Sequence, residues 1–237
     1  MILGHERQIK YLETVIKKNR MAHAHLFFGP EHVGKLVIAK MVAKALFCPH
    51  AKGGLMNVCH KCEACQKIEK NMHPEVIFLD TEHTLVSKKE TRKDIPIDDI
   101  RELKRVLSFA PHGAAWRVVI INEAEKMSAE AANAFLKILE EPGDLTLIIL
   151  ITSSRELLLP TILSRTQQIG FSLVSDEILK KFLEREKKYG ESHEEMLKIA
   201  GGRAGVLMRM REEKTFLSEE RTFFGAIQKG LDRKSVV

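Results

Sequence analysis

Apolar residues form unbroken runs at several places along the chain, and each run has the length of one β-strand. A strand that is apolar at every position is typical of a parallel sheet with both faces covered. Parallel strands need long crossover connections, which are usually helices. The predicted strands are residues 25–28, 75–80, 117–121, 145–152 and 169–171.

Between these runs, apolar residues recur at every third or fourth position, which is the period of an amphipathic helix. Strands and helices alternate up to Leu173 and only helices follow, so the pattern predicts an α/β domain and then a small helical domain. The predicted helices are residues 5–18, 35–47, 97–109, 128–141, 175–188 and 192–200, a helix introduced by residues 201–205, and a last one at 215–231.

The turn after the first predicted strand has the spacing of a phosphate-binding loop. Gly29, Gly34 and Lys35 fit the frame G-x-x-x-x-G-K-[ST], in which backbone N–H groups surround phosphates and the lysine reaches the outer ones. The last position normally offers a hydroxyl to Mg²⁺, but here it is Leu36. The sequence therefore predicts a nucleotide-binding scaffold that lacks one metal ligand.

A second departure follows the predicted strand 117–121. Phosphate-loop NTPases carry Asp-Glu at this place, and the Asp holds Mg²⁺. Here the pair is Asn122-Glu123, and a neutral amide is a poorer ligand for a hard dication than a carboxylate. ATP or ADP binding stays open, whereas Mg²⁺ and hydrolysis are not expected. Lys35 then either neutralises a bound phosphate or is a relic.

All four cysteines of the chain fall within residues 48–65, with the spacing C-x₁₀-C-x₂-C-x₂-C. Four thiolates can close a tetrahedral shell around Zn²⁺, and such a closed shell is structural because it leaves no open position. Two disulfides or four unrelated buried thiols are the alternatives, and a cytosolic setting disfavours disulfides. The predicted zinc ligands are Cys48, Cys59, Cys62 and Cys65.

Composition indicates the class of protein, its compartment and its possible partners. The chain has 237 residues, of which 44% are hydrophobic and 30% charged, as in globular proteins. No apolar run approaches the ~20 residues that span a bilayer, and the start lacks a secretory signal, so a cytoplasmic protein without membrane contact is expected. The net charge of +6 mildly favours a nucleic-acid neighbour. The charged segment 81–96 predicts a solvated loop, with contact to DNA or a partner as the alternative.

Two longer motifs are more specific. Residues 131–142 read Ala-Ala-Asn-Ala-Phe-Leu-Lys-Ile-Leu-Glu-Glu-Pro, and residues 159–166 read Leu-Pro-Thr-Ile-Leu-Ser-Arg-Thr. Together with the phosphate loop, the cysteines and residues 119–127, they resemble the clamp-loader subunits of bacterial DNA polymerase III, most of all delta-prime and then gamma/tau. The resemblance covers nearly the whole chain. It implies an AAA+ phosphate-loop NTPase fold with a parallel sheet, an inserted zinc-binding segment and a helical lid.

The resemblance also implies roles for single residues. Arg165 matches the arginine finger that acts on a neighbouring subunit's ATP, although a surface ion pair is the plain alternative. Thr152 matches a position that senses the γ-phosphate, or is an ordinary residue at a strand end. Gly205 falls where family motors carry a lid arginine, and Arg203 lies two positions earlier. With Leu36 and Asn122, this third loss predicts a delta-prime-like subunit without intrinsic ATPase activity.

The resemblance implies partners and an order of domains. The expected partners are gamma/tau and delta subunits, with the sliding clamp and primer-template DNA reached through the assembly. The alternatives are an active gamma/tau-type ATPase and a zinc-containing DNA-binding module. The expected domains are 1–173 (AAA+ core, with the zinc segment at 48–65), 174–215 (helical lid) and 216–237 (the start of a collar domain or a truncated end).

Overall fold

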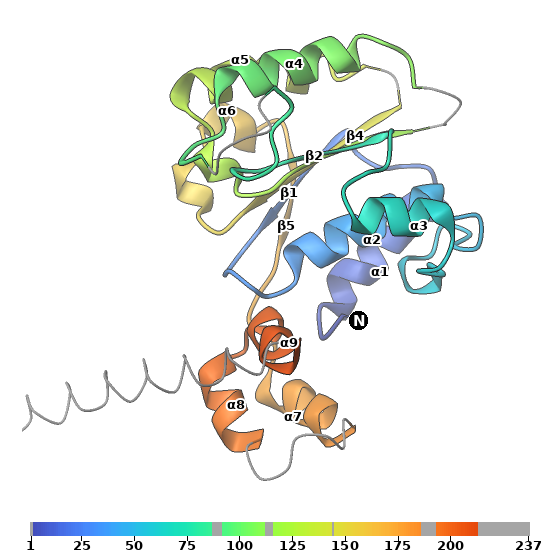
Figure 1. Ribbon diagram of the computed structural model, residues 1–237, viewed down its shortest axis with the longest axis vertical. Helices are drawn as coiled ribbons and strands as arrows, with labels where there is room; N and C mark the ends of the chain where they lie inside the picture. The colour runs from blue at the N-terminus through green and yellow to red at the C-terminus, as the bar shows by residue number, and fades with distance from the viewer. Residues whose placement is uncertain (1, 87–91, 112–115, 144, 186–192, 213–237) are drawn as a thin grey trace, which may run out of the picture.

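A five-stranded sheet forms the centre of the molecule (Figure 1), and all its paired strands are parallel, in the order β2-β3-β4-β1-β5. The computed structural model describes residues 2–86, 92–111, 116–143, 145–185 and 193–212. The strands are β1 (Ala24–Phe28), β2 (Val76–Leu79), β3 (Arg117–Ile121), β4 (Thr146–Thr152) and β5 (Gln167–Gly170).

Helices cover both faces of this sheet, which explains the unbroken apolar runs. On β3, Val118 and Ile120 join the hydrophobic cluster on one face, whereas Val119 and Ile121 join the cluster on the other. Helices α1 to α3 lie on the first face and α4 to α6 on the second (Figure 1). Their bounds are α1 (Glu6–Lys17), α2 (Lys35–Phe47), α3 (Glu63–Glu69), α4 (Ile97–Leu107), α5 (Ala129–Glu140) and α6 (Pro160–Leu163), and the 3₁₀ turns are η1 (Leu55–Asn57), η2 (Ala124–Lys126) and η3 (Arg155–Leu157).

Two local predictions were wrong. The last strand begins at Gln167 instead of Ile169, because β5 is an edge strand whose ladder to β1 starts at the His25–Gln167 pair. An edge strand can pair through its backbone while it carries exposed polar side chains. The apolar pattern therefore revealed only part of β5. No helix was predicted among the cysteines, but Glu63–Glu69 forms α3 with buried Cys65 and Ile68.

Three helices follow the sheet and form a third hydrophobic cluster, with Leu179, Met196 and Leu207 at its centre. Gly4 and Gly202 both approach the connecting segment at Val174, where the Val174 amide donates to the Gly202 carbonyl at 2.8 Å. The predicted helix 215–231 and residues 186–192 lie outside the described residues. The helices are α7 (Asp176–Arg185), α8 (His193–Ala200) and α9 (Ala204–Glu212).

Every helix within the described ranges is too short or too polar to cross a membrane.

Candidate functional site

The phosphate loop, residues 29–35, joins the end of β1 to the start of α2. Gly29 is required because a Cβ atom there would lie 2.0 Å from the carbonyl oxygen of Phe171. Lys35 Nζ donates to the carbonyl oxygens of Gly29 at 2.5 Å and Pro30 at 2.6 Å. Burial lowers the pKa of Lys35. The loop thus holds the lysine ammonium against its own main-chain carbonyl groups.

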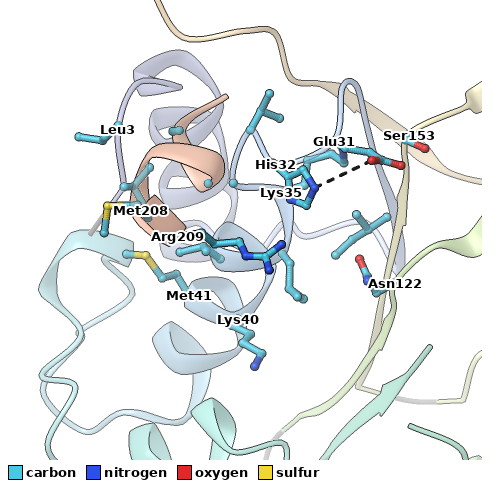
Figure 2. A pocket seen from close by; sticks show the side chains of 18 of the residues that line it. Leu3, Glu31, His32, Lys35, Lys40, Met41, Asn122, Ser153, Met208 and Arg209 are labelled. Atoms are coloured by element: carbon cyan, nitrogen blue, oxygen red, sulfur yellow. Dashed lines mark ion pairs between the residues drawn. The ribbon is translucent and has the colours of Figure 1, made fainter. Parts of the chain in front are cut away.

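A cavity of about 830 Å³ opens at this loop (Figure 2). The ends of β3 and β4, the start of α2 and the face of α9 contribute to its wall. Leu36 and Asn122, which replace the predicted metal ligands, both line it. The structure thereby brings together most of the predicted nucleotide-site residues, namely Gly34, Lys35, Glu123 and Thr152, and Gly29 contacts Lys35 through its carbonyl group.

Two glutamates on the wall are held by protein groups. Glu123 has a left-handed backbone (φ 54°), and its carboxylate pairs with Lys126 Nζ at 2.9 Å and accepts from the Thr81 hydroxyl at 3.3 Å. Glu125 accepts from the Ser153 amide at 3.0 Å and the Ser153 hydroxyl at 2.7 Å. Burial opposes ionisation of Glu125, but these hydrogen bonds outweigh it and keep its pKa below the usual value. Both carboxylates therefore have protein partners on the cavity wall.

Thr152 is the last residue of β4 and is buried. Its hydroxyl oxygen accepts from the Ser154 amide at 3.0 Å. The side chain lines the cavity, so its position fits both the predicted phosphate contact and an ordinary strand end.

Helix α9 closes one side of the cavity. The Gly205 amide donates to the His32 carbonyl oxygen at 2.6 Å, and a Cβ atom on Gly205 would lie 2.7 Å from that oxygen. Glycine therefore lets α9 pack directly on the phosphate loop. Arg203 donates to two main-chain carbonyl groups of α8 and does not line the cavity, whereas Arg209 does.

Among the wall residues missed from the sequence are Lys40, Glu125 and Arg209. Lys40 lies four residues after Leu36, and Arg209 lies four residues after Gly205, so each shares a helix face with a residue that was recognised. That spacing was available in the sequence. The register of α9 relative to the loop was not, because it depends on the contact between Gly205 and His32.

The four cysteines gather into one cluster beside α2. All four sulfur atoms lie within 4.8 Å of one another, and none is in a disulfide. Cys48 Sγ lies 3.6 Å from Cys59 Sγ and 3.9 Å from Cys62 Sγ. Tetrahedral zinc with bonds of about 2.3 Å requires sulfur atoms about 3.8 Å apart. These distances fit one metal ion and exclude four unrelated thiols.

The electrostatics of the cluster favour a thiolate at Cys59. Hydrogen bonds from the backbone amides of Lys61 and Cys62 lower the pKa of Cys59 to about 6. Burial raises the pKa of Cys65 to about 12. A bound metal ion would stabilise all four thiolates, because metal binding releases the thiol protons.

Arg165 follows α6 and lies away from the cavity wall. Its guanidinium donates to Glu140 Oε1 at 2.8 Å and to the Thr161 carbonyl oxygen at 3.2 Å. The side chain keeps 38% of its surface exposed. The predicted ion pair is therefore present, and the guanidinium remains accessible from outside the chain.

A family model described as "DNA polymerase III, delta subunit" matches residues 4–175. The chain belongs to the clamp-loader family of DNA polymerase III. Subunit delta' of Bacillus subtilis is 35% identical over 165 residues, which cover 70% of this chain and 46% of that protein. Subunit tau of the same organism is 32% identical over 178 residues, covering 75% of this chain and 30% of that protein. The clamp-loader chain described here thus spans less than half the length of these relatives.

Solved structures give the same fold. The Thermotoga maritima DNA polymerase III gamma subunit-related protein has a TM-score of 0.52 at 25% identity, over 84% of this chain and 57% of that one. The RuvB Holliday junction branch migration motor of the same organism has a TM-score of 0.57 at 13% identity, over 93% of this chain and 70% of that one, which shows the fold alone. The predicted AAA+ α/β fold with a parallel sheet is confirmed.

Proposed function

We propose that this clamp-loader chain acts as a delta-prime-like subunit, which binds its neighbours but does not hydrolyse ATP itself. The supporting observation is that Leu36 and Asn122 line the same cavity, so the phosphate loop persists where two oxygen ligands for Mg²⁺ are replaced. Mg²⁺ needs near-octahedral oxygen coordination, which an apolar side chain cannot complete. Without that ion, the charge that develops on the phosphates during transfer loses its main partner.

In this proposal Arg165 supplies chemistry to another subunit. Its accessible guanidinium would stabilise charge on the γ-phosphate of a neighbour's ATP. Residues 174–215 would act as the lid and residues 216–237 as the start of a collar domain, with zinc on the four cysteines as a structural ion. Gamma/tau and delta subunits are the proposed partners, and the sliding clamp and primer-template DNA are reached through the assembly.

The test is the ATPase rate of a loader reconstituted with Arg165→Ala. We expect the rate to fall by ~10³, the lower end of the range for arginine fingers, while the subunits still assemble. Arg101→Ala is the matched control, because Arg101 is also an exposed arginine in a surface ion pair, with Asp98 at 3.1 Å. An unchanged rate with Arg165→Ala refutes the arginine-finger role.

The gamma/tau-type ATPase remains the second candidate, because Glu123 is retained on the cavity wall and tau is a relative at 32% identity. It predicts ATP turnover by the isolated chain with Mg²⁺ that disappears in Lys35→Ala. The third candidate, a zinc-containing DNA-binding module, predicts DNA affinity that depends on Arg92 and Lys93 (Lys88 and Lys89 of the same segment lie outside the described residues).

A further inference from the structure

The four-cysteine cluster lies where two neighbouring helices meet (Figure 1). Cys48 directly follows α2, whereas Cys62 directly precedes α3 and Cys65 is buried within it. The sulfur atoms of these three residues and of Cys59 all lie within 4.8 Å of one another. A metal ion on these atoms would therefore tie the end of α2, which is the helix that begins at the phosphate loop, to the start of α3.

The far end of α3 returns to the middle of α2. Glu69 is the last residue of α3, and its carboxylate forms an ion pair with Lys44. The main-chain carbonyl oxygen of Glu69 accepts from Lys40 Nζ at 2.9 Å. Lys40, Lys44 and Glu69 all line the cavity at the phosphate loop. Helix α3 is thus attached to α2 at both of its ends, and the second attachment is part of the cavity wall.

The two lysines of this attachment depend on α3 to different degrees. Lys44 keeps only 4% of its side-chain surface exposed, and a buried ammonium group that loses its carboxylate partner is strongly destabilised. Lys40 has a further contact, because its Nζ lies 5.6 Å from the centre of the Phe78 ring on β2. A displacement of α3 should therefore affect Lys44 more than Lys40.

Helix α3 has little else to hold it in place. It has seven residues, of which only Cys65 and Ile68 are buried. Isolated helices of this length are marginal in water, so their position depends on tertiary contacts. Because one of the two buried side chains is a predicted metal ligand, the position of α3 should depend on the metal. Thiol groups alone form only weak hydrogen bonds and cannot replace the metal–sulfur bonds.

We propose that the metal on the four cysteines controls one wall of the phosphate-loop cavity: the metal fixes α3, and Glu69 then holds Lys40 and Lys44 in that wall. Glu69 is in this sense a positioning residue. The inference deepens the proposed function, because it rests on the proposed zinc ion and gives that ion a role at the cavity. It depends neither on ATP hydrolysis nor on Arg165, so the two proposals can fail separately.

The test is labelling of lysine side chains in the full chain with an N-hydroxysuccinimide ester, measured residue by residue by peptide mass spectrometry. The chain is compared with bound Zn²⁺ and after a zinc chelator has removed it, with a phosphine present to keep the thiols reduced. We expect Lys44 to be labelled roughly 10-fold faster without the metal, as for a local opening of the structure. Returning Zn²⁺ should restore the slow rate.

Lys35 is the internal control. It is buried at the other end of α2, where the carbonyl groups of the phosphate loop hold its ammonium group. Its labelling rate should stay the same with and without Zn²⁺, because neither α3 nor the cysteines hold it. A merely structural role of the metal, in which its loss loosens the whole domain, would raise the rates of Lys35 and Lys44 together.

Glu69→Gln tests whether the effect passes through Glu69. With Zn²⁺ bound, Lys44 should already be labelled faster in this variant, and metal removal should add less than about twofold, since the coupling is already broken. Glu63→Gln is the matched control, because Glu63 is a carboxylate of the same helix that pairs with Lys67 of α3 at 2.6 Å. The metal content of both variants should equal that of the wild type.

Four outcomes overturn the proposal. They are a chain that binds no Zn²⁺, a Lys44 that stays protected after metal removal, equal increases at Lys35 and Lys44, and an effect of the metal that is as large in Glu69→Gln as in the wild type. The ATPase rate of the assembly with Arg165→Ala depends on none of these measurements, so it still tests the arginine-finger role on its own.

Discussion

The phosphate-loop cavity and the surface around Arg165 match the motifs of the clamp-loader family in different ways. The cavity keeps its backbone, with Gly29 against Phe171 and Gly205 against His32, but carries Leu36 and Asn122 on its wall. The Arg165 surface keeps the side chain itself, held by Glu140. The difference has a physical reason. The backbone of the loop packs directly on other segments, so a change there would cost stability. A side chain that faces a cavity has fewer packing contacts, so its substitution costs less stability.

One pair of strands connects the two regions. β1 leads into the phosphate loop, β5 begins two residues after Arg165, and the two strands pair from His25–Gln167 to Phe28–Gly170. A perturbation inside this strand pair should therefore affect both regions together, whereas changes on the cavity wall or near Arg165 should affect one. The predictions below use this distinction, beginning with the largest effect.

Protonation of His25 should destabilise both regions. The ring is fully buried on β1, and neither ring nitrogen has a hydrogen-bond partner among the described residues. Burial, helped by the nearby His23, lowers the pKa of His25 from 6.5 to about 4. The unfolded chain then binds more protons between these values, so stability is complete above pH 6.5 and falls as the pH drops toward 4. The loss should reach about 3 kcal/mol.

Chemical denaturation of wild type and His25→Leu at several pH values measures this loss. The variant should lose about 3 kcal/mol less than wild type over the same interval, because it has no proton to bind there. His23→Gln is the control, since His23 is exposed and makes only the smaller contribution. Equal pH dependence in wild type and His25→Leu would show that His25 does not couple the fold to pH.

Much of the fold could be predicted from the sequence, because the central strands are buried on both faces and consist mostly of apolar residues. β3 and β4 illustrate this, since every residue of both is buried. The start of β5 could not be predicted, because its ladder to β1 involves polar Gln167, whose side chain says nothing about backbone pairing. The short helix α3 was hidden for a similar reason: only Cys65 and Ile68 are buried in it.

The candidate site shows the same division. Gly34 and Lys35 were predicted because the phosphate-loop frame places them by spacing. Glu123 was predicted from the acidic pair that phosphate-loop NTPases carry after a strand, and Thr152 from the resemblance to the clamp-loader family. Arg209 was missed, since no local pattern says which face of α9 meets the loop. That face is determined by a single close contact, Gly205 on His32, between segments far apart in the sequence.

Restoring both metal-binding side chains should return Mg²⁺ dependence to the cavity. In Leu36→Thr with Asn122→Asp, a hydroxyl and a carboxylate would face the phosphates, and these are preferred Mg²⁺ ligands. We expect ADP to bind ~10-fold more tightly with Mg²⁺ than with EDTA, in contrast to wild type. Isothermal calorimetry under both conditions measures the difference, and Asn122→Asp alone is the control for the added charge.

The same double variant should leave the Arg165 surface unaffected. The assembly reconstituted with it should keep the neighbour's share of ATPase activity, because Leu36 and Asn122 line a cavity that Arg165 does not reach. If the double variant binds ADP equally tightly with Mg²⁺ and with EDTA, the replacement of the two metal ligands does not explain why the cavity lacks Mg²⁺ dependence.

The smallest effect is expected next to Arg165 itself. Glu140 accepts from the guanidinium at 2.8 Å, and about half of its side chain is exposed, so the pair restricts the arginine only weakly. Glu140→Gln removes the charge but keeps the shape, and should lower the ATPase rate of the assembly by about threefold, as expected for a weak surface pair. Glu141→Gln is the matched control, being the exposed neighbour in sequence. A higher rate in Glu140→Gln would contradict this prediction. It would mean that Glu140 holds the Arg165 guanidinium away from the neighbour's nucleotide, so that breaking the ion pair increases the ATPase rate.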